Sequence, residues 1–167
     1  MNTGQMLLTI GALLLLSTVM LRVNSNNFST ETVRDEARFG VIATSIATSI
    51  IEQAKSFAFD ANTDTNSVTT LFELTSDFDL GPDAGENSAD IKTFNDFDDL
   101  DGYTKIDSTM QSAIFEISCS VNYVSEANLM GISSVPTWHK KISVTVSSPS
   151  MGDTLTEASI YSYWFFR

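Results

Sequence analysis

The chain has 167 residues, enough for one domain with an appended segment, and a formal net charge of −12. Apolar residues make up 43% of it and charged residues only 18%. So acidic a chain excludes nucleic acid as a partner, because binding to phosphates needs a basic surface. A single cysteine, Cys119, rules out an internal disulfide. The acidic, Ser/Thr/Asn-rich composition suits a secreted or surface protein.

The first segment, residues 1–23, is almost wholly apolar. Residues 6–21 hold no charge, and only Thr9, Ser17 and Thr18 are polar. The apolar residues surround the helix instead of forming one stripe, so the helix must be buried in lipid or among other helices. Its length nearly spans the hydrocarbon core of a bilayer. The residues expected to form this apolar surface are Met6, Leu7, Leu8, Ile10, Leu13, Leu14, Leu15, Leu16, Val19 and Leu21.

Three interpretations of this segment compete. A cleaved secretory signal normally has a basic start and an Ala-x-Ala-like cleavage site, and neither is clear here. The second is a plain membrane anchor, and Arg22, Arg34 and Arg38 after the segment would then favour a cytoplasmic C-terminal domain. The third is a helix that first lies in the membrane and later packs against copies of itself, for which Gly11 and Ala12 leave room.

Residues 24–59 predict an amphipathic continuation of this helix. The run Asn-Ser-Asn-Asn that opens them is a poor helix former, so a break in the helix is expected near residues 24–28. A second helix should begin near Ser29 or Thr30, where Ser and Thr are favoured as caps, and should end at about Phe59.

Residues 60–111 predict an acidic loop region. Residues 60–107 carry thirteen acidic side chains against two lysines, a balance of −11. An EF-hand loop needs Gly at its sixth position and Glu at its twelfth, and counting from Asp60 these positions hold Thr65 and Leu71. We therefore expect a solvated acidic loop, with structural calcium as the alternative.

From residue 112 onward the apolar residues recur with a period of two, which predicts strands over residues 113–123, 138–147 and 154–164. Short turns between strands make them antiparallel. A helix followed by a run of strands indicates an α+β fold. In this fold a long, protruding N-terminal helix packs on a C-terminal antiparallel sheet formed by residues 112–167.

The predicted core lies between this sheet and the second helix. The sheet and the helix should contribute Phe115, Ile117, Ile142, Val144 and Ile160 from the strands, and Val41, Ile46 and Ile50 from the helix.

The parts follow one another as apolar N-terminal helix, break, amphipathic helix, acidic loop and antiparallel sheet. This order resembles the architecture of type IV pilins and of the pseudopilins of type II secretion. A more local likeness lies in LGPDAGE at residues 80–86 and FNDFDDLDGY at residues 94–103. Both stretches resemble the GPEAGE and FDDVDDYxGY stretches of some prepilin-type proteins, including those related to mannose-sensitive haemagglutinin pili.

The resemblance implies a structural subunit of an extracellular pilus-like filament with a role in cell adhesion. Its partners would be copies of itself in a helical homopolymer and, before assembly, the inner membrane. Family members usually have a short basic leader that ends in Gly, and a Glu at the fifth mature position. Here the leader cleavage would fall between Gly4 and Gln5, the leader has no basic residue, and Thr9 would stand in place of the Glu. If Met1 is itself the mature start, Gln5 takes that position instead.

In another interpretation, residues 1–23 are a membrane helix but the chain does not form a filament. The chain would then be a single-pass membrane-anchored envelope protein, or a minor pilin or pseudopilin, that binds a partner without forming a major filament.

No sequence motif predicts an enzyme. The single histidine, His139, has no second histidine with which to share a zinc site, and the sequence has no nucleophile elbow, P-loop or dinucleotide fingerprint. His139 is expected to be an ordinary strand residue, and Cys119 a small buried thiol. We expect no cofactor, no metal site and no small-molecule substrate.

Overall fold

A computed structural model of the chain describes residues 2–163. The described part contains one long helix, α1 (Thr3–Ala54), and falls into two compact units, a first that ends at Arg38 and a second that begins at Phe39. After the helix come η1 (Ala61–Thr63), η2 (Leu71–Glu73), η3 (Ile91–Thr93), η4 (Asp98–Leu100), β1 (Thr104–Asp107), β2 (Phe115–Tyr123), β3 (His139–Ser147) and β4 (Leu155–Ser162).

In the first unit the helix continues without a break. Residues 24–28 are helical, so the predicted break there is wrong. Each Asn or Ser costs at most ~0.7 kcal/mol in a helix interior, which a helix extended on both sides can absorb. The nearby hydroxyls also bond back to helix carbonyls, from Thr30 Oγ1 to Asn26 O at 2.9 Å and from Thr32 Oγ1 to Phe28 O at 3.1 Å. These hydroxyl bonds are made within the helix and leave its backbone uninterrupted.

The helix ends at Ala54, earlier than the predicted end at Phe59. The Ser56 amide and hydroxyl both donate to the Gln53 carbonyl, at 3.0 and 2.6 Å, and tighten the last turn. The chain then leaves the helix because Ala58 pairs with the loop at Asp96 in a parallel bridge. Backbone pairing with a distant segment therefore replaces the last helical turn.

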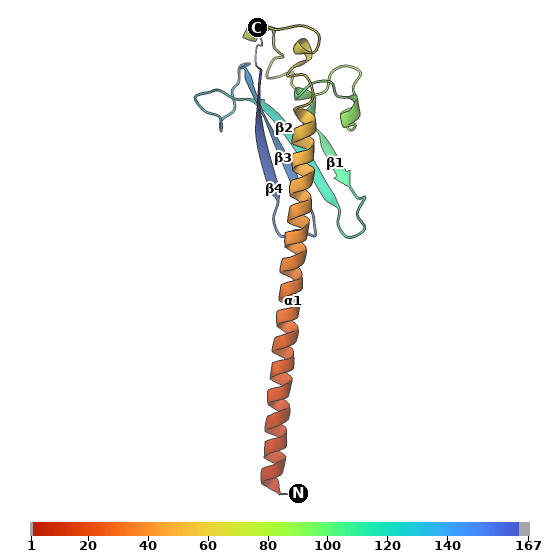
Figure 1. The fold of residues 1–167 in the computed structure, drawn as a ribbon, viewed down its shortest axis with the longest axis vertical. Helices are drawn as coiled ribbons and strands as arrows, with labels where there is room; N and C mark the ends of the chain where they lie inside the picture. Colours follow the sequence, from red (N-terminus) through yellow and green to blue (C-terminus); the bar gives the residue numbers. More distant parts are fainter. Residues whose placement is uncertain (1, 164–167) are drawn as a thin grey trace. The chain divides into compact units, whose positions relative to one another are not determined.

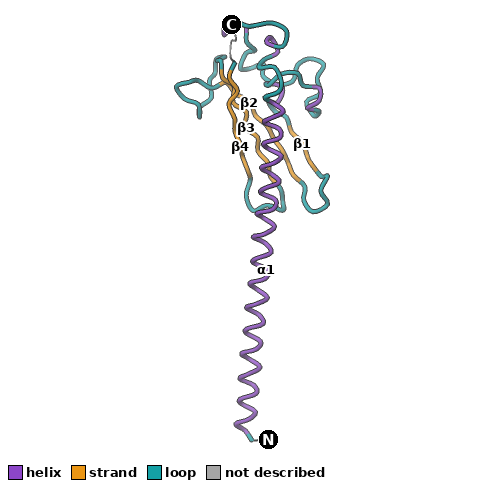
Figure 2. The backbone as a smooth tube through the Cα atoms, viewed as in Figure 1, coloured by secondary structure: helices purple, strands orange, loops and turns teal. Residues whose placement is uncertain are grey.

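The second unit contains a four-stranded antiparallel sheet in the order β1-β2-β3-β4 (Figure 2). Each strand pairs with its predecessor in the chain, as in β2 with β3, where Cys119 lies opposite Val144. The three predicted strands are confirmed as β2, β3 and β4, although Trp164, the last residue predicted for the third strand, lies outside the described residues. The strand β1 was not predicted, because its four residues are mostly exposed and carry no apolar alternation.

The part of α1 from residue 39 onward covers one face of this sheet (Figure 1), and the arrangement is α+β as predicted. Buried and exposed residues alternate along β2 and β3, so one face of the sheet meets the helix and the other is polar. On the helix the buried residues recur every three or four positions, at Phe39, Ala43, Ala47, Ile51 and Ala54.

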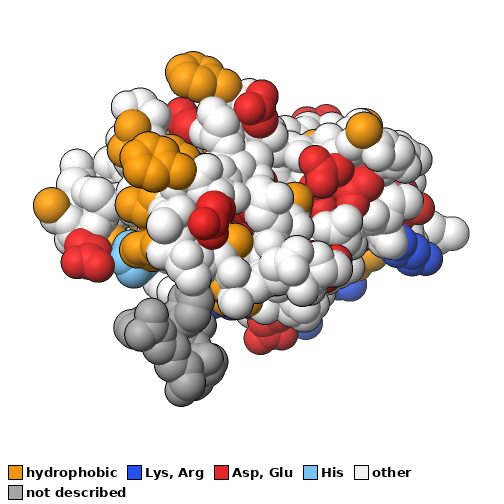
Figure 3. Space-filling model, turned by 90° about the horizontal axis from the view of Figure 1, so that it is seen from above, with side chains coloured by type: hydrophobic (Ala, Val, Ile, Leu, Met, Phe, Trp, Pro, Cys, Tyr) orange, Lys and Arg blue, Asp and Glu red, His pale blue; other side chains and the backbone are white. Residues whose placement is uncertain are grey.

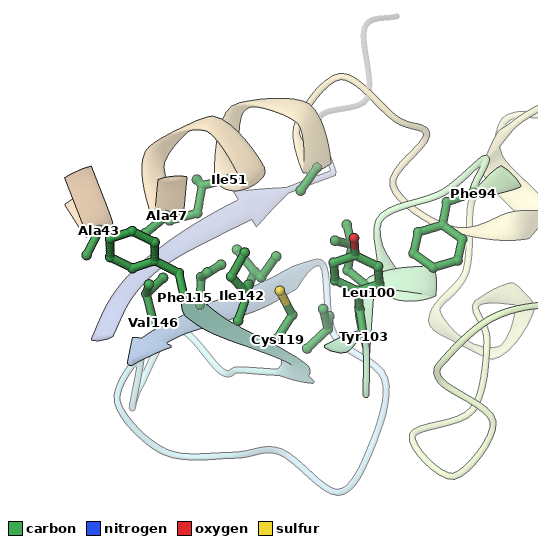
Figure 4. Packing of buried hydrophobic residues seen from close by; sticks show 14 of the residues in the cluster. Ala43, Ala47, Ile51, Phe94, Leu100, Tyr103, Phe115, Cys119, Ile142 and Val146 are labelled. Atoms are coloured by element: carbon green, nitrogen blue, oxygen red, sulfur yellow. The ribbon is translucent and has the colours of Figure 1, made fainter. Parts of the chain in front are cut away.

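The core between the helix and the sheet is closely packed (Figure 4). Ala43 and Ala47 are fully buried, and their small side chains let the helix approach the strands closely. The Phe39 and Phe115 rings meet edge to face, with 6.4 Å between their centroids. Of the predicted core, Phe115, Ile117, Ile142 and Val144 are buried, and Ile46 and Ile50 pack against them half-buried.

Two residues of the predicted core face elsewhere. Val41 is 71% exposed, because the helix face turned to the sheet runs through residues 39, 43, 47 and 51. Ile160 pairs with Lys141 and shares its face of the sheet, whereas its neighbour Tyr161 pairs with Lys140 and packs on the core. The alternation of apolar and polar residues in β4 is weak. The prediction of Ile160 as the core residue is therefore wrong by one position, and Tyr161 faces the core instead.

The acidic loop region is folded and partly buried. The region contains four short 3₁₀ helices. Its residues Val68 and Leu74 also join Phe59 and Tyr123 in a second apolar cluster. Four of its carboxyl groups are almost inaccessible, so the expectation of a wholly solvated acidic loop is wrong for Asp60, Asp96, Asp98 and Asp99. They are buried because backbone amides and a lysine supply the hydrogen bonds that water would otherwise make.

Candidate functional site

The apolar residues at the start of α1 are exposed on all sides. Every residue singled out there, from Met6 to Leu21, is at least half exposed, and Leu8 reaches 76%. The helix is long and apolar enough to cross a membrane. Large aliphatic side chains in this number are not stable in water, so lipid or other helices must cover them.

The first unit has room for a neighbouring helix at Gly11. A side chain built there would meet no atom within 4 Å, so nothing in the rest of the described chain requires glycine at this position. Gly4 and Gln5, where a leader would be cleaved, lie in the first turn of α1, and the Gln5 amide donates to the Asn2 carbonyl at 2.8 Å. Thr9, at the position where the resemblance to pilins would predict a Glu, donates its hydroxyl to Met6 O at 2.8 Å.

A second candidate site lies in the second unit around Lys140, a fully buried lysine on β3. Its Nζ donates to Asp60 Oδ2 at 2.8 Å, to Asp98 Oδ1 at 2.5 Å and to the Phe59 carbonyl at 2.9 Å. The ring centroids of Phe59 and Tyr123 lie 4.8 and 5.2 Å from the same atom. An ammonium this deeply buried is tolerated only because it is paired and hydrogen-bonded.

Asp60 is the fully hydrogen-bonded member of this group. It accepts from the amides of Asn62 and Thr75, from the Thr75 hydroxyl and from the Tyr123 hydroxyl, besides Lys140. Burial by itself would raise the pKa of Asp60, but the Lys140 charge and these hydrogen bonds together hold it below its usual value. Asp60 is therefore an anion.

Asp96 and Asp98 behave in the opposite way. Burial, followed by the hydrogen bond and the charge of Asp98, raises the pKa of Asp96 to about 9. Burial also raises the pKa of Asp98, against the opposing charge of Lys140. Asp60 and Asp98 thus contact one lysine, and Asp96 hydrogen-bonds to Asp98. The three carboxyl groups differ in protonation tendency, an arrangement typical of sites where protons are moved.

A carboxyl pair lies next to this group. Asp99 Oδ2 accepts from the amides of Asn95 and Asp96, both at 2.9 Å, and Asp99 Oδ1 is also buried. Burial and the hydrogen bond with Asp99 raise the pKa of the facing Glu86. The acidic residues of the 94–103 stretch therefore hold their own loop together, and Asp101 extends this by accepting from the Val121 amide at 2.8 Å.

Lys140 is a site residue that was not predicted from the sequence. The signal was present, because Lys140 alternates in phase with Ile142 and Val144 on the core face of the strand. A charged residue in phase with a buried stripe predicts a buried ion pair, although the sequence did not show which acidic residues would meet it.

His139 hydrogen-bonds to a serine and to a glutamate, which are the residue types of a Ser–His–acid triad. Its Nδ1 is 2.7 Å from Ser162 Oγ and its Nε2 is 3.3 Å from Glu126 Oε1. In a hydrolase the serine bonds to Nε2 and a buried acid bonds to Nδ1, which is the reverse of this arrangement. Glu126 is also largely exposed, so the row links β3 to β4 and a loop without forming a triad.

Cys119 is buried on β2, as expected, and burial raises the pKa of its thiol to about 12. Within residues 2–163, no group of three or more His, Cys, Asp or Glu side chains is arranged to hold a metal ion. Comparisons with protein-family models, with curated proteins and with solved structures found no match to this chain.

Proposed function

We propose that this chain is a structural subunit of an extracellular pilus-like filament, assembled through the apolar N-terminal part of α1. The observation that carries the proposal is the helix surface of residues 6–21, which is uncharged and apolar all round and is exposed in the single chain. A surface of this kind needs copies of itself or lipid to cover it. The order of helix, acidic loop and antiparallel sheet, which resembles that of pilins, supports the filament.

The proposal gives the helix two successive environments. The subunit first lies in the inner membrane through residues 6–21 and then moves into a bundle of identical helices in the filament. The second unit, with its acidic loop, faces water on the cell surface. The partners are then copies of this chain, with a role in adhesion at the filament surface.

One observation favours a second function, a membrane-anchored envelope protein or minor pilin that binds a partner without forming the filament. In either numbering of the mature chain, the acidic residue that pairs with a neighbour's N-terminus in pilins is absent. Thr9, in that position after cleavage at Gly4, has its hydroxyl bonded to its own helix. An uncharged residue there does not supply the inter-subunit ion pair.

The substitution Leu14→Asp tests the filament. Leu14 is 63% exposed within the apolar surface, and an unpaired carboxylate there would cost several kcal/mol once buried among helices or in lipid. We expect filaments to be absent from material sheared from cells that carry the variant, as seen by negative-stain microscopy. Mass spectrometry of the filament's N-terminus will show whether it begins at Gln5.

The matched control is Phe72→Asp, which adds the same charge at a residue 99% exposed in the second unit. Filaments should be normal in this control. Normal filaments in the Leu14→Asp variant would refute the proposal. A wild-type chain that stays in the membrane fraction and yields no sheared filaments would support the anchored protein instead.

A further inference from the structure

Lys140 and Asp98 meet in a dry environment that suits the formation of a covalent bond. Both side chains are almost completely inaccessible, with exposures of 0% and 3%, and Lys140 Nζ lies 2.5 Å from Asp98 Oδ1. The aromatic rings of Phe59 and Tyr123 flank the nitrogen. A lysine nitrogen held against a carboxyl group in the absence of water is an amine positioned for attack on that carbon.

We infer that Lys140 and Asp98 join in an intramolecular amide bond between Nζ and Cγ, with loss of one water molecule. This inference is independent of the filament proposal, because it concerns only contacts within the second unit. It assigns the buried group as a self-modification site.

Asp98, and not Asp60, is the acceptor. Asp60 is held as an anion by five hydrogen bonds, and a carboxylate resists attack by an amine. The Asp98 side chain contacts Lys140 and its neighbour Asp96, and burial favours its neutral form. A neutral carboxylic acid has the more electrophilic carbon, and its hydroxyl group leaves as water once it is protonated.

The step balances with groups already present. The Lys140 ammonium gives a proton to the Asp60 carboxylate, 2.8 Å away, and becomes a neutral amine. The amine lone pair attacks Cγ of Asp98. The neutral Asp96 carboxyl group, which hydrogen-bonds to Asp98, donates its proton to the departing hydroxyl, which leaves as water as the carbonyl re-forms.

The products need no outside reactant. The nitrogen passes its remaining extra proton to the Asp96 carboxylate, which is thereby restored, and Asp60 keeps the proton that it took from Lys140, because the lysine charge that held it as an anion is gone. The amide keeps one N–H, which still reaches Asp60 or the Phe59 carbonyl, the acceptors that Lys140 already bonds. The buried charges of Lys140 and Asp60 are replaced by a neutral amide and a neutral carboxyl group, which removes the cost of burying them.

The bond would lock β3 to η4, two elements 42 residues apart in the chain. A cross-link of this length limits the unfolded chain and holds the acidic loop on the sheet. A single cysteine, Cys119, allows no internal disulfide, and this amide would take that role without a redox partner.

Mass spectrometry of the purified full-length chain in detergent tests the inference. The wild-type mass should fall short of the sequence mass, after any N-terminal processing is accounted for, by one water. Cleavage after glutamate separates residues 87–116 from residues 127–157, and these two peptides should remain joined. A full sequence mass with both peptides free overturns the inference, and so does a link from Lys140 to residues 53–73, which contain Asp60.

Variants assign the roles. Asp98→Ala should show the full mass. Lys141→Ala, at the half-buried neighbour whose Nζ donates to Met130 O, should still lose one water. Asp96→Asn keeps both reacting groups, and the joined fraction should rise far more slowly with time than in the wild type. If the Asp96→Asn variant forms the amide at the wild-type rate, Asp96 takes no part in the reaction. Because the wild-type mass is decisive alone, a variant that fails to fold leaves the test intact.

Discussion

Single side chains in this protein owe their chemistry to the side of β2 or β3 on which they lie. Cys119, Ile142 and Lys140 all point to the core face, and all are nearly inaccessible. For Ile142 this burial stabilises the fold, whereas for Cys119 and Lys140 it changes what the group can do. Burial disfavours a charged sulfur or nitrogen unless partners are supplied, and only Lys140 has them.

Cys119 should be unreactive in the folded chain. Because its pKa is raised from 9.0 to about 12, the thiolate that reacts with disulfide reagents is scarce at pH 7 and remains scarce at pH 9. Labelling with a thiol reagent should be negligible in the native chain at both pH values and should reach one label per chain in denaturant. The same raised pKa means that stability is lost as the pH rises from about 9 towards about 12. Rapid native labelling would show that the strand opens.

Truncation of Ile142 should destabilise the second unit. The side chain is fully buried between β3 and the helix, and an Ile→Ala change in a core costs ~2–5 kcal/mol. The free energy of unfolding is measured by urea titration of the full chain in detergent. Ser143→Ala, one position along and on the opposite face, is the matched control and should change the stability little. A cost for Ile142→Ala no larger than for the control would mean that this face of β3 is not the core.

The buried residues could be predicted from the sequence where apolar and polar residues alternate strictly. Alternation placed Phe115, Ile117, Ile142 and Val144 correctly, because each apolar side chain in those strands is followed by a polar one. The partners of Lys140 were not predictable. They come from loops distant in the chain by 42 and 80 residues, and local pattern says nothing of such pairings.

At the scale of elements, α1 is one helix in two kinds of surroundings. Its residues from 3 to 38 are helical without burial, and those from 39 onward are held by the sheet. Helical hydrogen bonds alone give little protection against opening, because most helix stability in proteins comes from packing. The two parts should therefore differ in dynamics although they share one secondary structure.

Amide hydrogen exchange of the full chain in detergent should show that difference. Residues 24–28 lie beyond the apolar stretch and have no buried side chain, so their amides should exchange much faster than those of residues 43–47. The comparison is internal, because both stretches belong to the same helix. Equal protection in the two stretches would mean that residues 24–28 are covered in solution, by detergent or by another chain.

The predicted break and this expectation come from the same residues. Asn and Ser at positions 24–27 are weak helix formers, which lowers local stability without preventing the helix. Helix propensity measures the preference of each single residue, but the stability of the neighbouring turns decides whether the helix continues. The short strand β1 shows the converse, because pairing with β2 makes a strand of residues whose own pattern does not indicate one.

At the scale of the whole molecule, the charge is negative and unevenly shared. Residues 60–107 carry a balance of −11, and even with four carboxyl groups buried, many remain exposed. Viewed from above, acidic side chains are spread over the surface of the second unit and basic ones are few (Figure 3). Surfaces with this charge repel one another at low ionic strength.

Filaments of this chain, if they form as proposed, should therefore bundle more readily as salt rises. At 1 M salt the Debye length falls to ~3 Å, which screens repulsion between exposed carboxylates. Divalent cations should act at lower concentration than sodium. Light scattering of sheared filaments over a salt series measures the effect.

Neutralising exposed acids gives the control for this test. Asp64, Asp79 and Asp83 are exposed, and a triple change to Asn should lower the salt needed for bundling. Bundling that does not respond to salt would show that the acidic region does not form the outer surface of the assembly.

The strand order also sets how the second unit can fold. Each strand pairs with the one before it, so the sheet forms by successive hairpin closures over short stretches of chain. The contacts of Lys140 with Asp60 and Asp98 span 80 and 42 residues. They close longer loops than the strand pairings do, and so they cost more loop-closure entropy. The sheet should therefore form early and quickly, and the acidic loop should dock last, when Asp60 and Asp98 close over a strand that is already in place.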